Sequence, residues 1–287
     1  MILDEVHTYS AISQAIVLKL IADLKSLGCR LHIGTATMPS VLYHRIIDLL
    51  GAENVLETKL SPEELDGYDR HTIHKVSDWE VAWPVVKNAV ANDRKVLVVC
   101  NRVQTAQDVY TYLKDQYPDV DLLLLHSKLK RKDRKQREQD LLGLDKDGKS
   151  VGKFNTATGA CIVVSTQVVE VSLDISFDTM ITECAPLDAL IQRFGRVNRK
   201  RSEESIGKTK PIYVLAPPED EKTAKPYELP VLEKSFAVLP DGAILHERDL
   251  QEKIDAVFKS IDFLKIEEAS VFQETGEWTT PPLTNGS

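Results

Sequence analysis

The sequence contains few cysteines, and their spacing suits neither a metal site nor a disulfide framework. The four cysteines, Cys29, Cys100, Cys161 and Cys184, lie far apart, and no two of them form a C-x-x-C pair. This spacing gives no support to a zinc site or to a disulfide-stabilised secreted domain, and it favours a reducing cytoplasm.

Long apolar runs are also missing from the sequence. No stretch of about 18 apolar residues occurs, so no membrane-spanning helix is predicted. Residues 1–10 contain Asp4 and Glu5 and lack a basic start followed by an apolar run, which argues against a secretory signal. We therefore predict a cytoplasmic protein with no membrane partner.

An excess of acidic residues is present, and it is confined to the carboxyl-terminal part. The net charge is −8, and residues 217–287 hold 15 acidic and 7 basic side chains, which leaves 29 of each sign in residues 1–216. Two basic islands, Lys128–Arg137 and Arg193–Arg201, lie in this neutral part. A uniform acidic charge would argue against nucleic-acid binding. The two basic islands are compatible with a partner that carries phosphate groups.

Segments with helical spacing of apolar residues alternate with short apolar runs typical of buried strands. The predicted strands are Ile2–Leu3, Arg30–Gly34, Lys95–Cys100, Asp121–Leu125, Ala160–Ser165, Thr179–Thr182 and Pro211–Leu215. The predicted helices are Ala11–Leu27, Met38–Leu50, Trp79–Ala91, Thr105–Asp115, Asp133–Leu142 and Asp249–Ile261. This alternation predicts an α/β fold with a mainly parallel sheet flanked by helices.

Two adjacent carboxylates, Asp4 and Glu5, follow the first predicted strand. Ligands of open α/β sheets bind beyond the carboxyl ends of the strands. One carboxylate of such a pair can hold magnesium while the other orients an attacking water. An acidic pair is also common on protein surfaces, so the residues alone leave both interpretations open.

A phosphate-loop pattern, G-x-x-x-x-G-K-[ST], occurs at Gly143–Ser150. A true phosphate loop follows a strand and precedes a helix whose amino terminus faces the phosphates. Here a charged helix comes first and an apolar strand comes after, and Asp145 and Asp147 would face the anion. We interpret the segment as a surface loop and keep a small NTPase that uses it as an alternative.

Five segments, in this order, resemble the motif set of superfamily-two helicases: DEVH at Asp4–His7, TATMP at Thr35–Pro39, VVCNRVQTA at Val98–Ala106, STQVVEVSLDISFD at Ser165–Asp178 and QRFGRVNR at Gln192–Arg199. The segment at Ser165–Asp178 is similar to that of the CRISPR-associated helicase–nuclease of type I interference systems. The resemblance covers about residues 1–260. It implies RecA-like domains that clamp ATP and step along single-stranded DNA, with recruitment by an RNA-guided surveillance complex.

The resemblance implies ATP and magnesium as cofactors. Asp4 would hold the magnesium ion, and Glu5 would act as the base toward the hydrolytic water. Asp174 would lie near the ribose or position the arginines. The side chains expected to reach the γ-phosphate from the second domain are Gln192, Arg196 and Arg199.

Further roles are implied for coupling and for DNA. The expected coupling residues are His7, Thr35 and Thr37. Without the resemblance, Thr35 and Thr37 are equally compatible with a role as caps of the helix that follows them. The candidates for DNA phosphate contacts are Asn101, Arg102, Ser165 and Thr166. Such contacts position a strand and do not read its sequence. His71 and His74 are interpreted as surface or linker histidines.

The resemblance also divides the chain. Residues 1–66 would be the carboxyl-terminal part of a first RecA-like domain, residues 67–216 a complete second one, and residues 217–287 an acidic, mostly helical accessory region. The family's phosphate loop and nuclease domain are expected ahead of Asp4. We therefore expect a fragment without ATPase activity alone, and a separate amino-terminal half is one candidate partner.

Two further hypotheses stay open from the residues alone. One is a fragment of a DEAH-type RNA helicase. The other is a non-catalytic module that binds nucleic acid through the basic islands, or a protein partner through the acidic tail. Such a module would show salt-sensitive DNA binding that ATP does not alter.

Overall fold

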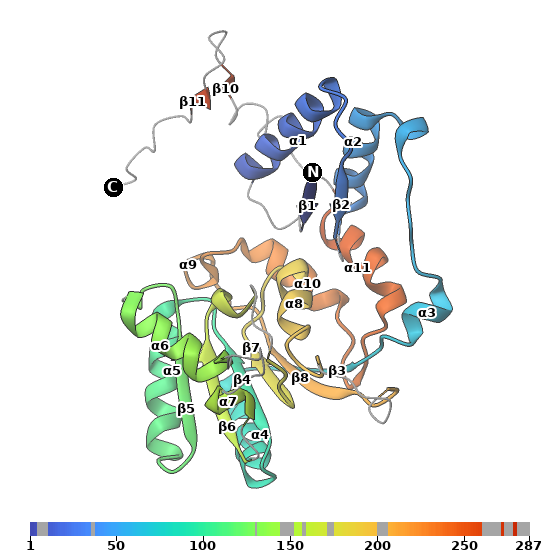
Figure 1. Ribbon diagram of the computed structural model, residues 1–287. Coiled ribbons are helices and arrows are strands. Elements are labelled where there is room, and N and C mark those ends of the chain that lie inside the picture. Colours follow the sequence, from blue (N-terminus) through green and yellow to red (C-terminus); the bar gives the residue numbers. More distant parts are fainter. Residues whose placement is uncertain are drawn as a thin grey trace. The chain divides into compact units, whose positions relative to one another are not determined.

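A computed structural model describes residues 1–4, 11–35, 38–129, 131–143, 152–156, 159–170, 175–199, 206–259, 271–272 and 278–279. The chain forms two compact units (Figure 1). The first contains residues 1–60 and 250–287, and the second contains residues 61–249. The break at residue 60 lies near the predicted boundary at residue 66, whereas the predicted acidic region is shared between the two units.

The first unit contains a short parallel sheet and the helices around it. β1 (Ile2–Asp4) pairs with β2 (His32–Gly34), with Asp4 opposite Gly34. The other elements of this unit are α1 (Ala11–Ser26), α2 (Ser40–Leu50), η2 (Ala52–Asn54), α11 (Leu250–Val257), β10 (Val271–Phe272) and β11 (Trp278–Thr279). Its core consists of Leu3, Val17, Leu18, Ile21, Met38, Leu42 and Ile46.

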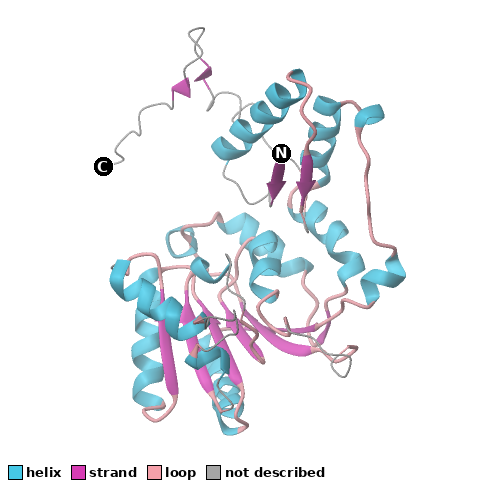
Figure 2. Ribbon diagram, viewed as in Figure 1, coloured by secondary structure: helices cyan, strands magenta, loops and turns pink. Residues whose placement is uncertain are grey.

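A seven-stranded sheet forms the centre of the second unit, with helices packed around it (Figure 2). In spatial order the strands are β5 (Asp121–Leu125), β6 (Cys161–Ser165), β4 (Lys95–Val99), β7 (Thr179–Thr182), β8 (Lys210–Leu215), β3 (His71–Val76) and β9 (Ala243–Ile244). Only β9 among them runs antiparallel to its neighbour. The predicted α/β fold with a mainly parallel sheet is therefore confirmed.

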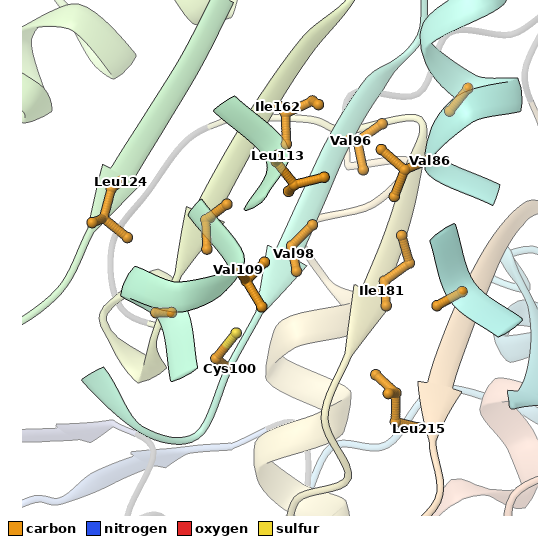
Figure 3. Packing of buried hydrophobic residues seen from close by; sticks show 14 of the residues in the cluster. Val86, Val96, Val98, Cys100, Val109, Leu113, Leu124, Ile162, Ile181 and Leu215 are labelled. Atoms are coloured by element: carbon orange, nitrogen blue, oxygen red, sulfur yellow. The ribbon is translucent and has the colours of Figure 1, made fainter. Parts of the chain in front are cut away.

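The helices of the second unit connect these strands. They are α3 (Pro62–Asp66), α4 (Trp79–Ala91), α5 (Val103–Gln116), α6 (Arg131–Leu142), α7 (Lys153–Thr156), η3 (Gln167–Glu170), α8 (Leu187–Phe194), α9 (Glu221–Ala224), α10 (Leu229–Val238) and η5 (Glu247–Asp249). Figure 3 shows side chains of α4 and α5 packed on strands β4, β6 and β7. None of the helices in the described part of the chain is long and apolar enough to cross a membrane.

Several elements of the structure were not predicted from the sequence, among them α3, β3, α8 and α10. Residues 71–76, for which no strand was predicted, form β3, and His71 is buried there with its Nε2 atom 3.0 Å from the Val197 carbonyl oxygen. The interpretation of His71 as a surface histidine is therefore wrong. The basic island Arg193–Arg201 begins within a helix, because α8 buries Leu187, Leu190 and Phe194 at helical spacing.

Candidate nucleotide and nucleic-acid site

Several predicted site residues lie at one edge of the sheet in the second unit. Strands β5, β6, β4 and β7 are neighbours and run parallel, so their carboxyl ends share that edge. Asn101 follows β4, and Thr166 follows β6. Backbone bonds join these ends: the Cys100 N–H donates to Ser165 O at 2.8 Å and the Glu183 N–H to Val99 O at 2.9 Å.

Asn101 is held by bonds from its backbone and from its side chain. Its backbone N–H donates to Glu183 Oε2 at 2.5 Å, and its side-chain Nδ2 donates to the Cys184 carbonyl oxygen at 2.7 Å. Its Oδ1 accepts a bond from Arg193 Nη2 at 3.0 Å. The backbone N–H and the side-chain amide of Asn101 are therefore bonded to other protein groups. Asn101 lies in the loop that joins β4 to α5.

Arg193 is fully buried, and it joins this loop to α8. Its Nη1 donates to Thr182 Oγ1 at 2.9 Å and to the Glu183 carbonyl oxygen at 3.2 Å. Its Nη2 also donates to the Tyr227 hydroxyl at 3.4 Å. A buried guanidinium is tolerated only where its donors find acceptors, and here the acceptors come from three separate chain segments.

Gln167 ties the end of β6 to the same cluster. Its Nε2 donates to the Asn101 carbonyl oxygen at 2.9 Å and lies 3.5 Å from the Tyr227 hydroxyl. Neither Tyr227 nor Gln167 was predicted as a site residue. Tyr227 lies between α9 and α10, and no local pattern in the sequence indicates that it reaches the sheet edge.

Burial changes the acid–base properties of carboxyl groups at this edge. Burial raises the pKa of the Glu183 carboxyl, against the lowering effects of the Asn101 N–H and of the charges on Arg193 and Arg102. Burial likewise raises the pKa of Asp188 in the first turn of α8. Such displaced pKa values indicate that acidic groups were placed where solvent cannot stabilise their charge.

The segment Gln192–Arg199 leaves α8 and then pairs with the segment around Phe177. The Phe177 N–H donates to Arg196 O at 3.0 Å, and the Asn198 N–H donates to Phe177 O at 3.1 Å. Asn198 has a positive φ of 54°, a conformation that asparagine tolerates. Arg196 is buried, whereas Arg199 is exposed and its N–H donates to Ser176 Oγ at 3.0 Å.

The predicted DNA contacts differ in their exposure. Ser165 and Thr166 are buried, and the Ser165 hydroxyl donates to the Thr166 carbonyl oxygen at 3.0 Å. Arg102 is exposed at the start of α5. Of these four candidates, Arg102 has an exposed side chain, Asn101 is half-buried, and Ser165 and Thr166 are buried.

In the first unit, Asp4 and Thr35 follow adjacent parallel strands. Asp4 ends β1 opposite Gly34, and Thr35 is exposed directly after β2. Several predicted positions lie outside the described residues: Glu5, His7, Thr37, Asp174 and the phosphate-loop pattern after Gly143. That pattern follows helix α6 and not a strand. Within the described ranges, no three His, Cys, Asp or Glu residues group as metal ligands.

The buried cysteines behave as small apolar side chains. Cys100 and Cys161 are buried at the end and the start of strands, and Cys184 is buried after β7. Burial raises the pKa of Cys161 to about 11 and that of Cys184 to about 12. These thiols stay protonated near neutral pH and are poor nucleophiles.

Comparison with solved structures defines the class of fold. A structure described as T. fusca Cas3-AMPPNP aligns with 93% of this chain and 36% of that chain, with 20% identity and a TM-score of 0.73. A structure of S. cerevisiae Dbp5 bound to RNA and ADP BeF3 covers 90% of this chain with a TM-score of 0.52. The fold is therefore that of the RecA-like domains of helicases.

Sequence comparison defines the family. Residues 92–202 match the family model described as CRISPR-associated nuclease/helicase Cas3, C-terminal. A CRISPR-associated nuclease/helicase Cas3 of Methanothermobacter thermautotrophicus is 30% identical over 272 residues, which cover 90% of this chain and 31% of the relative. A Streptococcus thermophilus relative of the same description is 29% identical over 290 residues and covers 90% and 30%.

These matches support a carboxyl-terminal portion of a CRISPR-associated Cas3 helicase, as the motifs predicted. The chain spans about a third of the length of the curated relatives that it matches. The alternative of a DEAH-type RNA helicase is not favoured by these relatives.

Proposed function

We propose that this chain forms part of an ATP-dependent DNA helicase of CRISPR type I defence, which unwinds target DNA for degradation. The observation that carries the proposal is the buried Arg193, which joins the β4–α5 loop, the end of β7 and α8 at one sheet edge. Relatives and solved structures of the Cas3 family add support for the class of activity.

We infer that ATP and magnesium are the cofactors. Solved Cas3 structures are described in ATP, ADP and AMPPNP forms, which supports nucleotide binding in the family. Asp4 at the end of β1 would hold the magnesium ion, because Mg²⁺ prefers carboxylate oxygens. Glu5 would orient the attacking water, and Asp174 would lie near the ribose. The γ-phosphate would be met by Gln192, Arg196 and Arg199.

The proposed partner at the sheet edge is single-stranded DNA. The exposed Arg102 would contact a phosphate, while Asn101, Ser165 and Thr166 would hold the backbone of the edge in place. His7, Thr35 and Thr37 would link nucleotide state to movement. A related structure is described as a CRISPR RNA-guided surveillance complex in a pre-nicking state, which supports such a complex as a further partner in the cytoplasm.

The DNA-binding part of this proposal is testable with the chain and a labelled single-stranded oligonucleotide. Affinity measured by fluorescence anisotropy should fall as salt rises. Arg102→Ala should weaken binding and lower the slope of log K against log salt by about 0.7, the value for one phosphate contact on a single strand. The matched control is Arg94→Ala, because Arg94 is exposed just before β4, at its amino end.

An equal loss of affinity in both variants would mean that binding does not use the carboxyl edge. Binding that tolerates high salt would contradict phosphate recognition altogether. An RNA oligonucleotide of the same sequence separates a DNA motor from an RNA-binding one. The non-catalytic alternative is separated by the effect of ATP, which should alter DNA binding by the intact helicase and not by a passive module.

A further inference from the structure

Helix α2 begins without a capping side chain of its own. Its N-cap residue is Pro39, which makes no side-chain hydrogen bond, and its first residue is Ser40. The first backbone N–H groups of a helix have no partner within the helix and need acceptors from elsewhere. This helix start directly follows the predicted coupling segment Thr35–Pro39.

The acceptor comes from α11, in the carboxyl-terminal segment. Asp255 Oδ1 accepts the Ser40 N–H at 2.7 Å, and Asp255 Oδ2 accepts the Ser40 hydroxyl at 2.7 Å. The two residues are 215 positions apart in the sequence. The carboxylate thus takes the place that a local Ser, Thr, Asp or Asn usually fills at a helix start.

A second residue of α11, Gln251, bonds to the backbone that precedes Pro39. Gln251 lies one helical turn before Asp255, on the same face. Its Nε2 donates to the Met38 carbonyl oxygen at 2.9 Å and to Asp255 Oδ2 at 3.2 Å. The backbone on both sides of Pro39 is therefore bonded to one short helix.

Burial and charge both stabilise this arrangement. Ile254 of α11 is fully buried, and Leu250 and Val257 are nearly so. Met38, whose carbonyl is held by Gln251, belongs to the core of the first unit. A negative carboxylate at a helix amino terminus is favoured by the aligned peptide dipoles.

We propose that Asp255 and Gln251 are positioning residues that fix the backbone on both sides of Pro39, at the start of α2, which makes α11 a working part of the first unit. The contact itself stands on geometry alone. Its functional meaning rests on the proposed function, in which Thr35 and Thr37 couple nucleotide state to movement.

Amide hydrogen exchange of the full chain tests the contact. In Asp255→Ala, exchange at the Ser40 N–H should be roughly five- to tenfold faster, as expected for loss of a helix cap. Asp255→Asn keeps one acceptor oxygen and should show an intermediate rate. Glu252→Ala is the matched control, because Glu252 is exposed on the same helix. An unchanged Ser40 rate in Asp255→Ala would overturn the contact.

A kinetic measurement tests the positioning role. In the longer helicase of which the proposed function makes this chain a part, Asp255→Asn should lower kcat for DNA-stimulated ATP hydrolysis severalfold and leave KM for ATP unchanged. An unchanged kcat, with faster Ser40 exchange, would reduce Asp255 to a structural cap and overturn the positioning role. If the unsubstituted protein hydrolyses no ATP, the proposed function fails, while the exchange result still decides the contact.

Discussion

At the scale of the residue, Arg193 is the largest fully buried side chain in the described part of the chain. Its bonds go to a threonine hydroxyl, a backbone carbonyl, an amide oxygen and a tyrosine hydroxyl. A planar fork of donors can reach four such acceptors at once, whereas the compact ammonium of lysine cannot. Arg193 therefore holds the carboxyl edge of the sheet together from within α8.

Glu183 is a partly buried carboxyl beside Arg193, and its position gives a pH dependence with a definite sign. Burial raises its pKa above the ordinary 4.5. As pH rises, the folded state therefore keeps this proton to a higher pH than the unfolded state does. The unfolded state then binds fewer protons, so the free energy of unfolding should fall as pH rises from about 4.5 through the folded pKa.

Glu183→Gln should remove this fall, since a glutamine can still accept the Asn101 N–H and does not ionise. The measurement is urea unfolding of the chain at a series of pH values between about 4.5 and 7. Glu219→Gln, at an exposed carboxyl, should leave the pH profile as it is. A Glu183→Gln profile that parallels the unsubstituted one would show that Glu183 does not cause the dependence.

At the scale of the element, α5 shows how a helical pattern becomes a buried face. Ala106, Val109 and Leu113 recur at helical spacing and are buried against the sheet, as Figure 3 shows for Val109 and Leu113. The sequence predicted this helix within two residues at its amino end and one at its carboxyl end.

Leu113→Ala should lower the free energy of unfolding by about 3 kcal/mol, because it removes a fully buried side chain and leaves a cavity. Denaturant unfolding gives the value directly. The control is Asp115→Ala on the same helix, where the side chain is exposed and the expected change is near zero. A loss below about 1 kcal/mol for Leu113→Ala would mean that α5 is loosely packed on the sheet.

Two of the elements that were not predicted, β3 and α8, each contain a buried polar or charged side chain. In β3, polar residues alternate with apolar ones, and His71, expected at the surface, is buried. In α8, the buried Arg193 lies in the same short helix as the buried Leu190. A polar side chain is compatible with a buried position only when a partner is present, and sequence does not show the partner.

At the scale of the whole molecule, the acidic tail is divided between the two compact units. Residues 217–249 join the second unit and residues from 250 onward join the first. Within the second unit the tail is tied to the residues near α3, since Arg248 pairs with Asp66 and the Glu247 N–H donates to Asp69 Oδ1 at 2.8 Å. Net charge located the tail but did not indicate how it is divided.

This division predicts the effect of shortening the chain. A protein that ends at Asp249 loses the Asp255 cap and the buried Ile254 of the first unit. The melting transition of the first unit should fall by roughly 10 °C or vanish, while that of the second unit stays. Calorimetry, with hydrogen exchange to assign each transition, measures both. An equal shift of the two transitions would contradict the assignment of α11 to the first unit.

The sequence by itself determined the α/β class, the positions of the central strands and the resemblance to the family. It could do so because helical and strand periods, and the order of motifs along the chain, are local properties. Only the tertiary structure decided that Asn101 is bonded to Arg193, 92 residues away, and that Asp255 caps a helix 215 residues away. Such partners are set by packing between distant segments, and nothing in either segment alone specifies the other.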